Sequence, residues 1–68
     1  MKTTREQVQQ EFSGIYDISF WDAYGKSRLY AKRNETENMG YIDLNTKEIK
    51  ETRPGNYSGL KKIYDFIF

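Results

Sequence analysis

The sequence contains no cysteine and no histidine. The absence of cysteine excludes disulfide bonds, thiolate nucleophiles and cysteine-ligated zinc sites. The absence of histidine removes the most common general base of enzymes and the most common ligand of transition metals. Pairs of carboxylates such as Glu35 with Glu37 lie in short polar runs, where solvated surface is the expected environment. We therefore expect no enzymatic activity, no metal, no cofactor and no small-molecule substrate.

Long hydrophobic runs are also absent from the sequence. No segment approaches the ~20 apolar residues that a membrane-spanning helix requires. The N-terminal segment MKTTREQVQQ is polar and has no apolar stretch that could serve as a signal peptide. We therefore expect a cytoplasmic protein that has no membrane partner.

The chain has almost no excess of charge of either sign. It contains 11 Lys and Arg against 10 Asp and Glu, which gives a net charge of +1. Proteins that bind nucleic acid by neutralising several phosphates usually carry a clear basic excess. The overall balance therefore argues against a dedicated nucleic-acid-binding protein, and only a local basic patch would restore that function.

Aromatic residues, by contrast, are abundant. They make up 16% of the chain, with six Tyr, four Phe and one Trp. A chain of 68 residues can form one small domain, which buries only about 60% of the surface that the unfolded chain exposes. Large rings help such a small core, because each one buries a large area. We expect a single domain over residues 1–68.

The N-terminal segment is expected to form a helix over residues 3–12. Thr3 is predicted as its N-cap and Glu6 as its third helical residue, because Thr and Glu at this spacing form a capping box. Val8 and Phe12 are four residues apart, so they lie on one face of this helix.

The C-terminal segment, residues 58–67, shows the clearest amphipathic pattern of the chain. Its apolar residues have the helical spacing i, i+3, i+4 and i+7 and are Leu60, Ile63, Tyr64 and Ile67. We expect Asn56 or Ser58 to cap this helix, which then covers the sheet. Phe66 and Phe68 fall outside the apolar stripe, so they wrap a helix edge, stay exposed or form a candidate interface with a partner.

Four runs between these helices have the period of two that is typical of strands. They cover about residues 14–21, 26–33, 39–44 and 47–52. The side chains expected to face the helices are Tyr16, Ile18, Phe20, Leu29, Ala31, Ile42, Leu44 and Ile49. A loop of three to five residues, containing Asp22 and Gly25, is expected to join the first two strands. Gly40 marks either a β-bulge or a close approach of two backbone segments.

This order of elements predicts an α+β domain of the type α-β-β-β-β-α. We expect a three- or four-stranded antiparallel meander with one face covered by the C-terminal helix and a short N-terminal helix. The other face is expected to be open to solvent. By alternation, the side chains on the open face are Ile15, Asp17, Ser19, Trp21, Lys26, Arg28, Tyr30, Lys32, Met39, Tyr41 and Asp43.

The aromatic and basic side chains of this face form the candidate binding site, which consists of Trp21, Lys26, Arg28, Tyr30, Lys32 and Tyr41. One interpretation is an ordinary solvated face, on which Asp17 and Asp43 pair with basic side chains of the neighbouring strand. A second interpretation is a protein-binding surface. A third is a nucleic-acid-binding surface, because single-strand-binding sheets combine rings that stack on bases with cations that follow phosphates.

We expect a small non-enzymatic binding protein that uses either this sheet face or the apolar C-terminal edge formed by Phe66 and Phe68. A protein partner or self-association is the first hypothesis. The alternative is a nucleic-acid-binding module that uses the strand with Lys26, Arg28, Tyr30 and Lys32. The two carboxylates on the same face disfavour this alternative.

Overall fold

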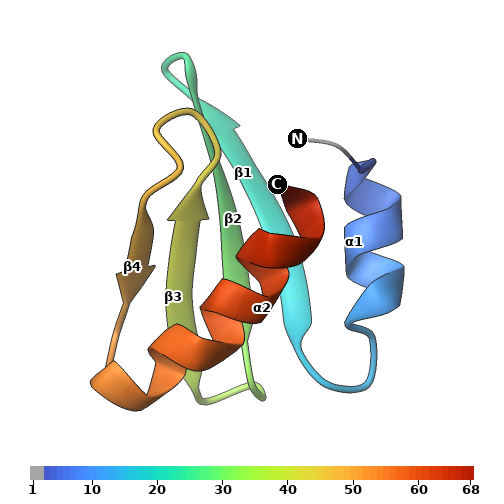
Figure 1. The fold of residues 1–68 in the computed structure, drawn as a ribbon, viewed down its shortest axis with the longest axis vertical. Coiled ribbons are helices and arrows are strands. Elements are labelled where there is room, and N and C mark those ends of the chain that lie inside the picture. Colours follow the sequence, from blue (N-terminus) through green and yellow to red (C-terminus); the bar gives the residue numbers. More distant parts are fainter. Residues whose placement is uncertain (1–2) are drawn as a thin grey trace.

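The computed structural model describes residues 3–68. In chain order its elements are α1 (Arg5–Glu11), β1 (Asp17–Ala23), β2 (Lys26–Lys32), β3 (Asn38–Asp43), β4 (Ile49–Glu51), a 3₁₀ turn (Pro54–Asn56) and α2 (Tyr57–Ile67) (Figure 1). The sheet has the strand order β1-β2-β3-β4, and each strand is antiparallel to its neighbour. The α+β meander predicted from the sequence is therefore confirmed.

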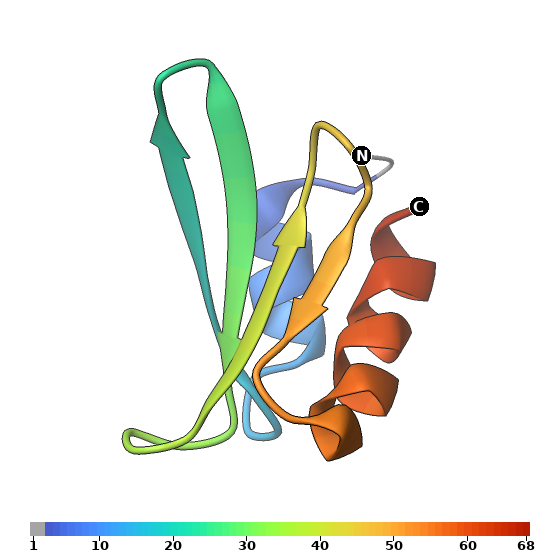
Figure 2. The same cartoon turned by 90° about the vertical axis from the view of Figure 1, so that its left-hand side faces the viewer.

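Both helices lie on the same face of the sheet. α2 packs against β3 and β4, and α1 packs beside β1 (Figure 1). Seen from the side, the opposite face of the sheet carries neither helix (Figure 2). Neither helix of residues 3–68 has the length and apolar character that crossing a bilayer requires.

The core lies between the sheet and the two helices. Its buried side chains are Val8, Phe12, Ile18, Leu29, Ala31, Met39, Ile42, Leu60, Ile63 and Ile67. With the exception of Met39, these are residues that the alternation and the helical spacing place toward the interior. Tyr16, Phe20, Leu44, Ile49 and Tyr64 are partly buried against them, as predicted. Each fully buried Leu or Ile side chain stabilises the fold by about 1.5–3 kcal/mol.

The first helix begins one residue later than predicted. Thr4 is its N-cap, and Thr4 Oγ1 accepts a hydrogen bond of 3.2 Å from the backbone N–H of Gln7. Gln7 Oε1 in turn accepts one of 2.9 Å from the backbone N–H of Thr4. Glutamine closes a capping box as well as glutamate does. The pair of Thr4 with Gln7 therefore replaces the predicted pair of Thr3 with Glu6.

The hairpin between β1 and β2 is tighter than predicted. β1 extends through Ala23, and the loop consists of Tyr24 and Gly25 alone. Both loop residues have positive φ, 54° for Tyr24 and 74° for Gly25. Positive φ at both central residues is typical of a type I′ turn, whose twist matches that of the flanking strands. The predicted loop of three to five residues is therefore wrong.

A β-bulge changes the face on which Met39 lies. Ala31 pairs with Gly40, whereas the next residue of β2, Lys32, pairs with Asn38, so that Met39 has no partner on β2. The irregularity turns the Met39 side chain into the core, where it is fully buried. The prediction that Met39 lies on the open face is wrong, because strict alternation does not hold across a bulge.

The segment between β4 and α2 is fixed by a buried asparagine. Asn56 is only 4% exposed, and its side chain makes no capping bond to α2. Instead its Nδ2 donates to Thr52 Oγ1 at 3.1 Å, and its Oδ1 accepts from Arg33 Nη2 at 3.3 Å. Asn56 is thus the N-cap residue of α2, as one of the two predicted alternatives has it, but its side chain bonds elsewhere. Asn56 joins the start of α2 to the end of β4 and to the loop that follows β2.

Candidate functional site

The strand register places the aromatic and basic side chains of the candidate site on the open face. Trp21 of β1 lies opposite Arg28 of β2, and Arg28 lies opposite Asp43 of β3. In the neighbouring row, Tyr30 of β2 lies opposite Tyr41 of β3. The site is thus built by three adjacent strands, and each of its side chains projects away from the helices.

Arg28 is held between two aromatic rings. Its guanidinium carbon lies 5.4 Å from the centre of the Trp21 ring and 4.6 Å from the centre of the Tyr41 ring. Its Nη1 donates a hydrogen bond of 3.2 Å to the hydroxyl of Tyr30. This hydrogen bond raises the pKa of Arg28 above its usual value, so the guanidinium stays charged. We call Trp21, Arg28, Tyr30 and Tyr41 the aromatic–arginine cluster.

The rings of the cluster do not form a continuous row. Tyr30 and Tyr41 are in contact, with ring centres 5.4 Å apart. Trp21 reaches them only through the guanidinium of Arg28. Each cation–π contact of this kind contributes about 0.5–1 kcal/mol at an exposed site. Trp21 is still 38% exposed, while Arg28 and both tyrosines are half-buried.

One nitrogen of the cluster has no partner. Arg28 Nε is shielded from solvent and makes no hydrogen bond within residues 3–68. Buried N–H groups are normally paired, because an unpaired one loses its bonds to water without replacement. Arg28 is therefore incompletely satisfied by its own chain.

Lys26 and Lys32 flank the aromatic–arginine cluster without carboxylate partners within residues 3–68. Asp17 lies opposite Lys32, as one interpretation of the sequence expects, but no ion pair joins them. Within residues 3–68 the ion pairs join Arg5 to Asp22, Lys50 to Glu48, and Lys61 to Asp65. Lys26 and Lys32 are exposed and are not among them.

Asp43 is engaged by the turn that follows its strand. Its Oδ1 accepts hydrogen bonds from the backbone N–H groups of Asn45 at 2.9 Å and of Thr46 at 3.1 Å. The bond from Thr46 is the main reason that the pKa of Asp43 lies below its usual value. Asp43 therefore stays ionised, and it stabilises the turn although Arg28 lies opposite it.

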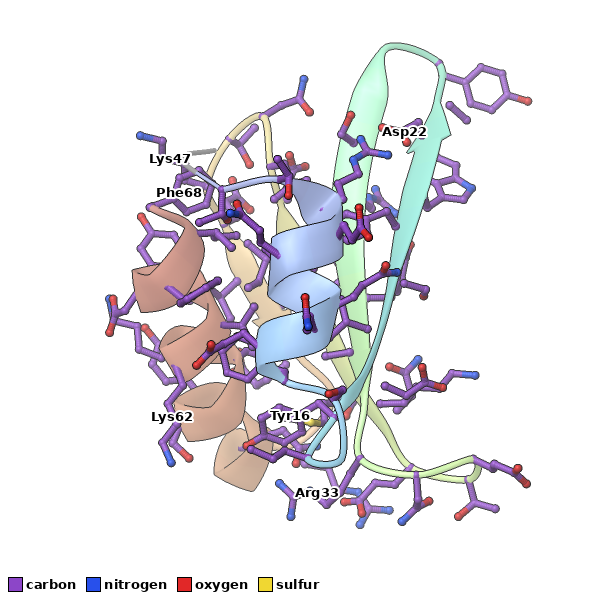
Figure 3. The ribbon with its side chains drawn as sticks, turned by 90° about the vertical axis from the view of Figure 1, so that its right-hand side faces the viewer. Tyr16, Asp22, Arg33, Lys47, Lys62 and Phe68 are labelled. Atoms are coloured by element: carbon purple, nitrogen blue, oxygen red, sulfur yellow. The ribbon has the colours of Figure 1, made fainter. Side chains whose placement is uncertain are left out.

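A network on the other face of the sheet fixes the hairpin tip to α1. Arg5 donates to both carboxylate oxygens of Asp22, with a distance of 2.6 Å from Nη2 to Oδ1. Ser27 Oγ donates to the same Oδ1 at 2.6 Å. Asp22 is labelled close to the hairpin tip in Figure 3. The bond from Arg5, followed by the one from Ser27, lowers the pKa of Asp22 to about 2.

This network predicts a pH-dependent contribution to stability. The folded pKa of Asp22 is depressed, so its contribution is complete above the unfolded value of 3.8 and is lost as the pH falls to about 2. We expect Asp22→Asn to lower the thermal midpoint at neutral pH, and the difference from the wild type to shrink as the pH falls from 3.8 through about 2. Thermal unfolding of both proteins across this range measures the effect. A difference that persists at the acid end would contradict the assignment.

The two C-terminal phenylalanines of the second candidate surface pack within the chain. Phe66 contacts Phe12 edge to face, with ring centres 5.7 Å apart. The ring centres of Phe68 and Tyr64 are 4.9 Å apart. Lys47 Nζ lies 5.1 Å from the centre of the Phe68 ring (Figure 3). Both phenylalanines are half-buried. The open face therefore presents the more accessible set of candidate residues.

The sequence reasoning missed two residues near the site. Lys50 lies opposite Tyr41 and adds a fourth cation to the open face. Its position after the inward-facing Ile49 is the signal that could have placed it there. Tyr24 is 95% exposed at the hairpin tip. The sequence places it in a loop, where no pattern of residues predicts exposure.

Within residues 3–68, no group of Asp and Glu side chains is arranged to hold a metal ion. The comparisons with protein-family models, with curated proteins and with solved structures find no match to this chain. A functional proposal therefore depends on the chemistry of the open face.

Proposed function

We propose that this chain is a non-enzymatic binding protein whose open sheet face contacts an acidic segment of a protein partner. The observation that carries the proposal is the position of Arg28 between the rings of Trp21 and Tyr41. The rings hold the guanidinium in place. A carboxylate of the partner supplies the acceptors that a guanidinium binds best.

The composition of the face fits the anatomy of protein interfaces. Trp, Tyr and Arg dominate the residues that contribute most to binding energy in such interfaces. Here they form the centre of the face, and charged or polar side chains surround them. A central aromatic and arginine cluster with a polar rim is the usual arrangement.

The charge of the face indicates an acidic partner. Four cations lie on it, Lys26, Arg28, Lys32 and Lys50, and the carboxylates near them are Asp17, Asp43 and Glu48, which pairs with Lys50 at 3.8 Å. Asp43 is already bonded to the turn after β3. The remaining positive charge attracts carboxylates and disfavours basic partners.

The same cluster favours a protein partner over nucleic acid. Single-strand-binding sheets use ring faces that are free to stack on bases. Here the guanidinium of Arg28 contacts the rings of Trp21 and Tyr41, and it is bonded to Tyr30 as well. Less ring surface is therefore free for bases.

The proposal predicts selective binding of acidic peptides. We expect random dodecapeptides displayed on phage and selected against the folded protein to be enriched in Asp and Glu. The synthetic versions should change the fluorescence of Trp21, which is the single tryptophan of the chain and lies at the site. Peptides in which Lys replaces each acidic residue are the matched controls. Selected peptides without acidic enrichment, or without a saturable change in Trp21 fluorescence, would contradict the proposal.

An oligothymidylate titrated across a salt series tests the alternative. Each phosphate contact adds about 0.7 to the log–log salt slope of a single strand. Tighter binding of the oligonucleotide than of the selected peptides, with a slope of several contacts, would replace the protein partner by nucleic acid.

A further inference from the structure

Tyr24 at the tip of the β1–β2 hairpin contributes nothing evident to folding. Its side chain is 95% exposed. Within residues 3–68 its ring makes no aromatic contact and its hydroxyl no hydrogen bond. The hairpin tip projects beyond the body of the domain (Figures 1 and 2). The ring is therefore presented entirely to solvent.

Tyrosine is also an unfavourable residue for this turn. Tyr24 has a φ of 54°, in the left-handed region that residues with a Cβ rarely adopt. The first central position of a type I′ turn favours Asn, Asp or Gly. A residue that fits neither the local turn nor the core is the kind of exception expected at functional sites.

The tip is held rigidly from both sides. On one side Asp22 is bonded to Arg5 of α1 and to Ser27 of β2. On the other, Asn45 of the β3–β4 turn accepts from the backbone N–H of Ser27 at 2.9 Å and donates to the carbonyl of Gly25 at 3.3 Å. The backbone that carries Tyr24 is thus fixed before any partner arrives. Such preorganisation reduces the entropy that binding would otherwise lose.

We propose that Tyr24 is an anchor that packs against apolar side chains flanking the acidic segment of the same protein partner. The inference rests on the proposed function, because Tyr24 lies on the hairpin that also carries Trp21, Lys26 and Arg28. Trp21 and Tyr24 are three residues apart, which corresponds to about 10 Å along a strand. An extended dodecapeptide is roughly 40 Å long and can contact both rings.

The test is Tyr24→Asn, with Tyr57→Asn as the matched control. Tyr57 is 45% exposed and is the first residue of α2, outside the open face. Because asparagine fits the type I′ turn, we expect Tyr24→Asn to raise the thermal midpoint by about 5 °C. We also expect it to weaken the selected acidic peptides about tenfold, measured by Trp21 fluorescence. Tyr57→Asn should leave peptide affinity within about twofold of the wild type.

The failure of this inference is distinguishable from the failure of the proposed function. Fluorescence anisotropy of labelled peptides measures Trp21→Ala, which has no tryptophan. If Tyr24→Asn binds the peptides like the wild type while Trp21→Ala does not, the anchor is wrong and the open face still binds. If both variants bind the peptides like the wild type, the proposed function and the anchor are both wrong. A lowered thermal midpoint for Tyr24→Asn would refute the view that this tyrosine is unfavourable to folding.

Discussion

Replacing Gly40 with alanine is expected to unfold the protein at room temperature. Gly40 has a φ of 126°, where a residue with a Cβ is strained. A methyl group at this position would overlap the carbonyl oxygen of Lys50 and lie 3.0 Å from the Cα of Glu51. Both obstacles are backbone atoms of β4, which cannot rotate away as a side chain would. β4 would have to separate from β3.

The expected loss is large compared with the stability of a small domain. Gly40 pairs with Ala31 on one side and with Glu51 on the other, so its displacement disturbs two strand pairings. Severe backbone strain combined with a broken sheet costs about 4 kcal/mol or more. A single core of this size rarely provides more than about 3–5 kcal/mol. Far-ultraviolet circular dichroism and the fluorescence of Trp21 would measure the loss of structure.

Gly55→Ala is the matched control for this prediction. Gly55 lies in the 3₁₀ turn before α2, and a Cβ there would meet no atom within 4 Å. Its φ is not in the left-handed region. We expect this variant to change the free energy of unfolding by no more than about 0.5 kcal/mol. A Gly40→Ala protein with the same thermal midpoint as Gly55→Ala would show that the close approach does not constrain the fold.

Gly40 also illustrates how far the sequence determined the fold. A glycine inside an alternating run indicates a bulge or a close backbone approach, and the structure contains both at this position. The alternation itself placed Ile18, Leu29 and Ile42 in the core correctly. The alternation failed at Met39. The bulge shifts the pairing of β2 with β3, and the sequence of neither strand alone predicts this shift.

Local signals placed the ends of elements less accurately than their faces. Two overlapping capping boxes are available at the start of α1, and their sequences do not decide between Thr3 and Thr4. The hairpin loop was predicted too long, because Tyr24 is not a residue that a type I′ turn favours. In both cases the tertiary structure selects one of several local possibilities.

The candidate site was predictable as a set of residues but not as a geometry. Alternation placed Trp21, Arg28, Tyr30 and Tyr41 on one face, and the register confirms that placement. The insertion of Arg28 between two rings depends on that register and on side-chain rotamers. The hydrogen bonds of the Asn56 side chain to Arg33 and Thr52 join separate segments of the chain, so no local sequence pattern predicts them.

Reversing the charge of Arg28 is expected to have the largest effect on binding. Arg28→Glu removes the cation at the centre of the aromatic–arginine cluster and places a carboxylate opposite Asp43. Like charges opposite each other on a sheet are destabilising, and the contacts to Trp21 and Tyr41 are lost as well. We expect the free energy of unfolding to fall by about 1–2 kcal/mol. The protein remains folded, because the core on the other face is untouched.

The affinity for the selected acidic peptides should fall about a hundredfold in Arg28→Glu, because a charge-assisted hydrogen bond is replaced by repulsion. Lys62→Glu makes the same change in net charge on the exposed side of α2 (Figure 3), so it separates a local effect at the cluster from a general one. Titrations of the selected peptides by fluorescence measure both variants. Because the guanidinium near Trp21 is lost in one of them, fluorescence anisotropy of labelled peptides gives an independent reading. Equal weakening by the two substitutions would mean that net charge alone governs binding, and the arginine held between two rings would then have no specific role in recognition.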